Sequence, residues 1–344
     1  MNKTTLYRGL VVVGFLVVLV WVAPYASHES STDTAQNTLL EQSYWHSRII
    51  AVGGGSAYTE FGTAVAPLSV QDQHTAAHAF GGALFDVEGE KGLSVCDSNF
   101  NFGCYHEFLG RSISTLGLSV VTSLNQGCVD VLGKQSLSCQ HGIGHGVLSY
   151  LGYTKEALLK GLEQCESLPF NDPIGGCYGG LFMEYNLQTM LSFEGRIRPQ
   201  GENPHEPCDE LDAKYRRACY YWQPQWWAQT FKPIDRETVF AQMGEWCLAA
   251  GQNIRDCFEG IGNITSSESG FNPAVARTLC QVTSGNARYQ LYCKSVAANS
   301  LGVGGGGKKG DGVAICQDLD AENYEYCAAY AQNRFNILVP GILP

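Results

Sequence analysis

Residues 154–185 read TKEALLKGLEQCESLPFNDPIGGCYGGLFMEY, and this stretch decides the fold. A run of helix-forming residues leads into Cys165, and a turn rich in glycine, proline, asparagine and aspartate follows it. Cys177 then opens a second apolar run. The pattern predicts two helices joined by a turn, with a disulfide between the end of the first helix and the start of the second.

The same arrangement recurs along the chain. Each cysteine pair encloses between 7 and 12 residues, and the second cysteines follow one another every 34 to 42 residues. Closing such a loop stabilises the fold by roughly 2–3 kcal/mol on the chain-entropy model. The fourteen cysteines form seven expected pairs: Cys96 with Cys104, Cys128 with Cys139, Cys165 with Cys177, Cys208 with Cys219, Cys247 with Cys257, Cys280 with Cys293, and Cys316 with Cys327.

A further unit without cysteines precedes these pairs. Residues 57–66 are expected as its first helix and residues 72–81 as its second. Residues 302–310, GVGGGGKKG, are expected as a mobile loop between the last two units. A repeat of this length is typical of stacked helical hairpins. The sequence therefore predicts an all-α protein, an α/α solenoid of about eight helical-hairpin repeats, seven of them with a local disulfide.

The paired cysteines and the repeat length resemble those of disulfide-linked Sel1-like and TPR-like α-solenoids. The resemblance implies that successive hairpins stack side by side through residues 39–344. It carries over no functional residue.

The N-terminus predicts export from the cytoplasm. Lys3 and Arg8 precede the uncharged run GLVVVGFLVVLVWVA at residues 9–23. We expect residues 1–26 to be a signal anchor with a cytoplasmic N-terminus, residues 27–38 a polar linker, and residues 39–344 the extracytoplasmic domain. A cleaved signal peptide is the alternative. Both place the cysteines in an oxidising compartment, whether periplasm, cell surface or lumen.

The composition excludes several classes of function. Charged residues make up 16% of the chain and the net charge is -11, which disfavours nucleic acid as a partner. The sequence contains no P-loop, no GxSxG and no HExxH motif. The aromatic tract YYWQPQWW at residues 220–227 is interpreted as core, with the wall of a pocket as the alternative.

Five of the eight histidines occupy one phase of the second helices. They lie two or six residues after the second cysteine of a unit, or after Asp72 in the first unit. Residues four apart share one face of a helix, and equal positions of stacked units come close together. The sequence therefore predicts that five imidazoles meet on three adjacent helices: His74, His78, His106, His141 and His145.

Converging imidazoles suit zinc, copper or iron. Glu107 is the candidate ligand or catalytic base beside them, and Glu184 is a more distant candidate. Gly142 and Gly144 favour a close approach by a helix or a ligand. A structural histidine network and a metal-free ligand cleft remain the alternatives.

Two functions of different classes follow. The first is a membrane-anchored metalloprotein whose activity, as an oxidase, oxygenase or hydrolase, is left open. It is loosely similar to deoxyhypusine hydroxylase, whose helical repeats hold iron through His-Glu pairs. The second is a metal-free scaffold that binds a peptide or protein on its concave face.

Overall fold

The computed structural model describes residues 37–133, 136–168, 172, 174–190, 197–199, 201–230, 235–304 and 309–332. These residues form helices and turns and no strand, so the all-α prediction is confirmed. The predicted signal anchor, residues 1–26, and most of the predicted linker lie outside the described residues. Among the helices that are described, none has the length and apolar character needed to cross a membrane.

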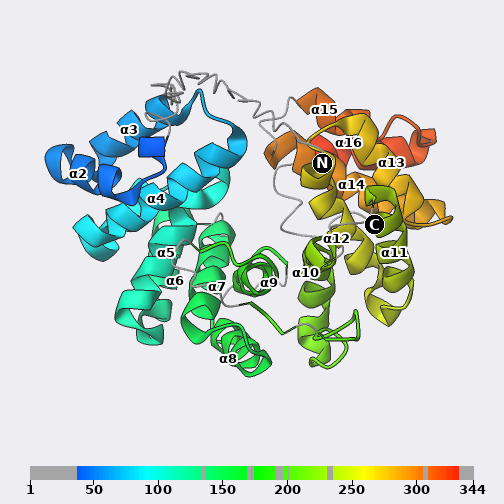
Figure 1. The fold of residues 1–344 in the computed structure, drawn as a ribbon, viewed down its shortest axis with the longest axis horizontal. Helices are drawn as coiled ribbons and strands as arrows, with labels where there is room; N and C mark the ends of the chain where they lie inside the picture. The colour runs from blue at the N-terminus through cyan, green and yellow to red at the C-terminus, as the bar shows by residue number, and fades with distance from the viewer. Residues whose placement is uncertain are drawn as a thin grey trace, which may run out of the picture.

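Eight inner helices form one continuous row, in which each helix packs against the next along the chain. In Figure 1 the row curves into an arc that is open on one side. The solenoid remains our interpretation of this helix order. The inner helices are α4 (Val70–Glu88), α5 (Gly103–Leu116), α7 (Leu137–Leu151), α9 (Cys177–Leu187), α10 (Ala213–Thr230), α12 (Ile254–Glu268), α14 (Ala287–Gly304) and α16 (Ala321–Gln332).

A second set of helices lies outside this row. Six of them pack against the inner helix that follows in sequence, and α2 packs against both α3 and α4. Trp45 and Ile49, one turn apart on α2, are buried against the first unit. The outer helices are α2 (Gln42–Val52), α3 (Gly54–Val65), α6 (Val121–Leu132), α8 (Lys155–Glu166), α11 (Arg236–Leu248), α13 (Pro273–Val282) and α15 (Lys309–Ala314).

All seven disulfides join the cysteines that the sequence pairs, and every cysteine is bonded. Their sequence separations run from 8 to 13. Each bond ties the first two turns of an inner helix to the segment before it, and seven local disulfides indicate an oxidising compartment. The bonds are Cys96 to Cys104, Cys128 to Cys139, Cys165 to Cys177, Cys208 to Cys219, Cys247 to Cys257, Cys280 to Cys293, and Cys316 to Cys327.

The second cysteine does not open the inner helix in every unit. Cys177 is the first residue of α9, as predicted, but Cys219, Cys293 and Cys327 lie in the second turn of α10, α14 and α16. Residues upstream start two of these helices. The side chains of Asn286 and Asp320 accept backbone hydrogen bonds from Arg288 and Asn323, which favours a helix start before the cysteine.

Two units depart from the predicted hairpin. Before Cys96 the chain forms only the short 3-10 helix η1 (Gly89–Val95), because Gly89 ends α4 in a left-handed conformation at φ +60°. Before Cys208 the described residues form turns rather than a helix. Pro199, Pro204 and Pro207 lie there, and proline removes the backbone donor that a helix interior needs.

Two further expectations are corrected at the ends of the domain. The helix α2 precedes the first unit and was not predicted. The loop expected at residues 302–310 is wrong at both edges, because α14 continues to Gly304 and α15 begins at Lys309. Residues 305–308 lie outside the described residues.

Glycine allows the inner helices to approach one another closely. A Cβ at Gly144 of α7 would overlap the carbonyl oxygen of Cys177 on α9, and one at Gly81 of α4 would overlap the carbonyl oxygen of Cys104 on α5. A Cβ at Gly142 would lie 2.8 Å from Leu109 of α5. Neighbouring helices, not a ligand, therefore account for the two glycines between His141 and His145.

Candidate metal centre

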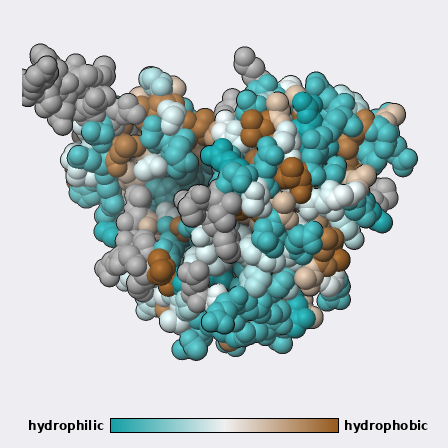
Figure 2. Space-filling view, turned by 45° about the vertical axis from the view of Figure 1, so that its right-hand side comes forward, coloured by the Kyte–Doolittle hydropathy of each residue, from teal (hydrophilic) through white to brown (hydrophobic). Residues whose placement is uncertain are grey.

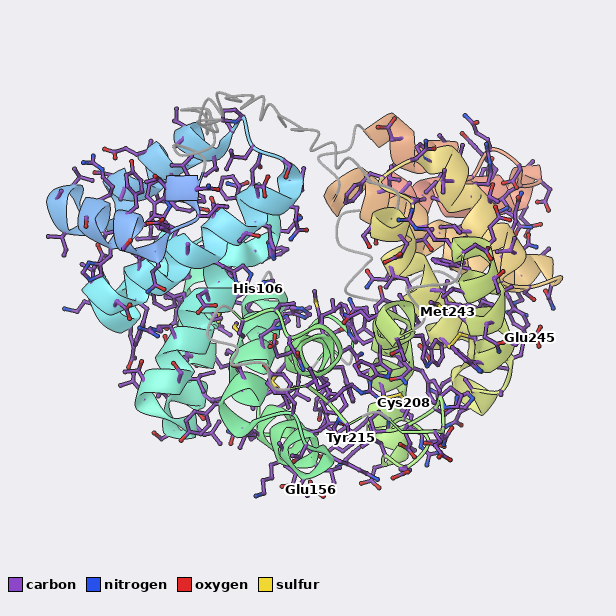
Figure 3. All side chains as sticks on the ribbon, in the orientation of Figure 1. His106, Glu156, Cys208, Tyr215, Met243 and Glu245 are labelled. Carbon is purple, nitrogen blue, oxygen red and sulfur yellow. A yellow bond between two sulfur atoms is a disulfide. The ribbon has the colours of Figure 1, made fainter. Side chains whose placement is uncertain are left out.

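The structure brings together the five histidines that the sequence singled out. His74 and His78 lie on α4, His106 on α5, and His141 and His145 on α7. These three helices are consecutive members of the inner row. Figure 3 places His106 on the inner side of the arc, whereas Glu156 and Glu245 lie at its outer rim.

The five imidazoles form two groups of three that share His106. In each group, one ring nitrogen per residue lies within 4.8 Å of the others. The ring centroid of His106 lies 5.4 Å from that of His78 and 4.8 Å from that of His145. The groups are His74, His78 and His106 on one side, and His106, His141 and His145 on the other.

A backbone carbonyl orients His74. Its Nδ1 lies 2.8 Å from the carbonyl oxygen of Phe100, and a carbonyl can only accept, so Nδ1 carries the proton. The lone pair of neutral His74 is therefore on Nε2, which lies 3.2 Å from Nε2 of His78. On the other side of His78, Nδ1 lies 3.5 Å from a carboxylate oxygen of Glu107, whose side chain is also buried.

The carbonyl of Phe100 belongs to a left-handed turn. Phe100, Asn101 and Phe102 have φ values of 54°, 52° and 61°. The left-handed region costs a residue other than glycine roughly 1–2 kcal/mol. Strained backbone of this kind is enriched at functional sites. Here it positions a hydrogen-bond acceptor for a histidine of the cluster.

A buried carboxylate orients His145. The Nδ1 of His145 lies 2.9 Å from Oε2 of Glu184 on α9. Tyr153 and Thr189 also donate hydrogen bonds to this carboxylate, at 2.6 Å and 2.7 Å. Burial favours the protonated acid, but the hydrogen bonds from His145, Tyr153 and Thr189 keep the pKa of Glu184 below its ordinary value. The ionised carboxylate accepts the Nδ1 proton of His145, which leaves the lone pair on Nε2.

Several imidazole nitrogens of the cluster are buried without a hydrogen-bond partner among the described residues. They are Nδ1 of His78, Nδ1 of His106, Nδ1 of His141 and Nε2 of His145. A buried polar atom without a partner costs about 1–3 kcal/mol, so native proteins seldom keep several together. Metal binding would satisfy the nitrogens of His106, His141 and His145, which belong to one group of three.

Burial keeps three imidazoles of the cluster neutral, those of His74, His106 and His141. Burial, together with His78, lowers the pKa of His74 to about 4. Burial and the other four imidazoles hold the pKa of His106 well below its ordinary value, and burial with His145 does the same for the pKa of His141. A neutral imidazole is the form that binds a metal. These three residues therefore present their lone pairs at neutral pH.

The spacing of the His74 and His78 nitrogens fits one coordination sphere. Two nitrogens bound to one tetrahedral ion at about 2.0–2.1 Å lie about 3.3–3.4 Å apart. The Nε2 atoms of His74 and His78 are separated by 3.2 Å. The hydrogen bond from His74 to a carbonyl and that from His145 to a carboxylate match the outer interactions that orient metal-binding histidines. These residues could hold a transition metal ion.

The cluster opens onto a cavity of about 700 Å³, and His74, His106 and His141 form part of its wall. Trp222 of α10 also lines it, with its ring centroid 5.6 Å from that of His141. The opposite wall comes from α12 and α14, through residues such as Ser300. Figure 2 shows the molecule hollowed between its N-terminal and C-terminal helices.

Of the two acidic candidates, Glu184 and not Glu107 makes the closer contact with a histidine of the cluster. Glu107 is not among the described residues that line the cavity, and its carboxylate faces His78 instead. Its position suits the orientation of a ligand better than contact with a bound water. Glu184, expected to be more distant, contacts His145 directly. The sequence places Glu184 on the helix that follows α7 in the inner row, but one position beyond the phase of the histidines.

The aromatic tract contributes to both core and cavity. Trp227 is buried in the core, whereas Trp222 and Gln225 line the cavity. The helix α10 continues through Pro224. Both interpretations of the tract therefore apply, each to different residues.

No family model, curated protein or solved structure matches this chain, so the site rests on the chain's own residues.

Proposed function

We propose that this protein is an extracytoplasmic metalloprotein that binds a transition metal ion through the histidine cluster and presents it to a small molecule in the adjoining cavity. The observation that carries the proposal is that Nε2 of His145 is buried without a hydrogen-bond partner among the described residues. The ring proton of His145 is held on the opposite nitrogen by Glu184, which leaves the lone pair on Nε2. A metal ion would accept this lone pair as a Lewis acid.

The ligand set limits the metal to a few elements. Three imidazole nitrogens per group suit zinc, copper or iron, whereas magnesium and calcium prefer oxygen ligands. Three protein ligands leave a coordination position open, as in catalytic rather than structural zinc sites. A metal bound here would polarise a substrate oxygen or lower the pKa of a bound water, which supports a hydrolase. An oxidase or oxygenase activity would require copper or iron in the site and dioxygen as the oxidant.

The cavity indicates what kind of molecule would reach the metal. Its described lining residues include amides, hydroxyls and aromatic rings but neither lysine nor arginine, and Glu268 is its single carboxylate. An anionic group would find no cationic side chain among them and would depend on the proposed metal ion for its counter-charge. The side chains themselves favour a molecule with both apolar and hydrogen-bonding groups.

A metal-free binding scaffold is the second candidate. The cavity is lined by residues from α4 through α14, on the concave side of the arc, where an extended peptide could lie. The two candidates differ in metal content, because a scaffold has no reason to retain metal in fixed proportion.

The seven disulfides support an oxidising compartment outside the cytoplasm. We propose that residues 1–26 hold the protein at a membrane with its N-terminus in the cytoplasm, so that the helical domain and its cavity lie on the other side.

The test is the metal content of the full-length chain purified without chelators. We expect zinc, copper or iron in fixed proportion to protein, and a lower metal content in His145→Gln. The matched control is His205→Gln, because His205 lies outside the cluster beside Tyr220. A wild-type chain that carries no metal and takes up none on titration would leave the scaffold as the better account.

A further inference from the structure

The arrangement of the cluster bears on how many metal ions it holds. A single ion that binds nitrogen at about 2.1 Å cannot have two of its ligand atoms more than about 4.2 Å apart. Within each group of three, all the ligand atoms lie within 4.8 Å of one another, a span only slightly above that limit. The five histidines together do not form one such group among the described residues.

The two histidine pairs lie on opposite sides of His106. The pair on α4, His74 and His78, and the pair on α7, His141 and His145, are separated by the helix α5 that carries His106. Centroids of the paired rings lie 4.7 Å apart on α4 and 4.8 Å apart on α7. Two imidazoles on one tetrahedral ion have centroids about 5 Å apart, since each centroid lies about 3.2 Å from the ion. Each pair is therefore spaced to share an ion.

Each pair is also oriented by its own outer contacts. His74 donates to the carbonyl of Phe100, and His145 donates to the carboxylate of Glu184. Glu107 faces His78, on the α4 side. Both pairs therefore carry the kind of outer contact that orients metal-binding histidines.

We propose that the centre holds two metal ions, one bound by His74 and His78 and the other by His141 and His145, with His106 between them. The inference rests on the proposed metal-binding function. The ring of His106 has two nitrogens and can offer one to each ion. When both ions are bound, this ring carries no proton and forms a bridge between them.

Such a pair would act on the cavity from two points. His74 and His141, one from each group, both line the cavity wall together with His106. With two histidines and the shared ring of His106 as protein ligands, each ion would keep an open coordination position. The site would then offer a molecule in the cavity two separate metal positions, coupled through the shared histidine.

The test is the stoichiometry of the full-length chain after chelator treatment and reloading with zinc. We expect two zinc ions per wild-type chain and two in the control His205→Gln. The double variants His74→Gln/His78→Gln and His141→Gln/His145→Gln should each keep one. A wild-type chain that binds one zinc ion would overturn the two-ion inference and leave the proposed function intact, whereas a chain that binds none would overturn both.

A second measurement needs no variant and so does not depend on the folding of a double mutant. Copper(II) ions that share one ring couple magnetically. In wild type, the electron paramagnetic resonance signal of isolated copper should therefore grow up to one ion per chain and fall as the second ion binds. A signal that grows steadily to two independent ions would overturn the role of His106 as a shared ligand.

Discussion

The Nδ1 atom of His145 lies 2.9 Å from Oε2 of Glu184, and neither side chain is exposed to solvent. A buried carboxylate without partners is costly, and this one receives hydrogen bonds from Tyr153 and Thr189 as well. The pair fixes the rotation of the imidazole and the position of its proton. The lone pair of neutral His145 is therefore on Nε2 and is available to the cluster.

Glu184→Gln should weaken metal binding because it removes the negative charge that holds the His145 proton on Nδ1. We expect the affinity to fall by about 10–100-fold, the usual effect of losing such an outer contact. Competition against a chromophoric chelator measures it. The matched control is Glu166→Gln, since Glu166 pairs with Lys214 on the surface. Equal affinities in all three proteins would show that Glu184 does not support a metal ligand.

Metal-free protein should lose stability in acid through its buried histidines. The pKa of His74 is about 4 in the folded protein, against about 6.5 in an unfolded chain. Between these values the unfolded chain binds more protons, so the free energy of unfolding falls as pH drops from about 6.5 towards 4. His74 alone contributes at most ~3 kcal/mol to this loss, and His106 and His141 add to it in the same direction.

Urea unfolding in the presence of a chelator at several pH values checks this dependence. The comparison is His74→Gln, which cannot gain that proton and should lose less stability between neutral and acidic pH. If the two proteins lose the same amount, His74 is not held neutral by the fold.

Gly144→Ala should destabilise the fold although alanine is the better helix former. The added Cβ would overlap the carbonyl oxygen of Cys177 and push α7 away from α9. Overpacking of this kind costs about 1–3 kcal/mol. Gly62 of α3 is the matched control, because a Cβ there meets only Phe100, at 3.9 Å. Gly62→Ala should stabilise by up to about 1 kcal/mol, and thermal unfolding that ranks the two variants the other way would contradict the packing described here.

Each local disulfide should stabilise its own unit. Replacing Cys247 and Cys257 together with serine opens a bond of sequence separation 10. The free energy of unfolding should fall by roughly 2–3 kcal/mol on the chain-entropy model. Chemical denaturation measures the loss, and hydrogen exchange should place most of it in α11 and α12. A loss spread evenly over the whole chain would contradict a local role.

The disulfides and the histidine cluster could be predicted from the sequence for the same reason. Each second cysteine faces the helix or turn before it, so counting from that cysteine gives the face on which every later residue lies. His141 and His145, two and six residues after Cys139, therefore share a face with His106, two residues after Cys104. Stacking of the inner helices then brings these faces together.

Counting from the cysteine gives the face of a helix but not its first residue. Cys219 and Cys327 lie in the second turn of their helices, because α10 begins at Ala213 and α16 begins at Ala321. The start of a helix depends on local caps, such as the Asp320 side chain that accepts a hydrogen bond from the backbone of Asn323.

Other features depend on contacts that counting along a helix does not provide. Glu184 is seven residues after Cys177, one position beyond the phase of the histidines, and Met183 occupies that phase and lines the cavity. Only the packing of α9 against α7 brings Glu184 to His145. The helix α2 has no cysteine to mark it, and the prolines before Cys208 prevent a helix that the repeat alone would predict.

The central claim, a metal bound by imidazole nitrogens, is tested most directly by X-ray absorption spectroscopy of the zinc-loaded full-length chain. The account predicts a first shell of nitrogen at about 2.0–2.1 Å, with the outer scattering that is characteristic of several imidazole rings. No sulfur shell near about 2.3 Å is expected, because every cysteine is in a disulfide. A first shell of oxygen alone, without ring scattering, would contradict the claim that the histidine cluster is the metal site.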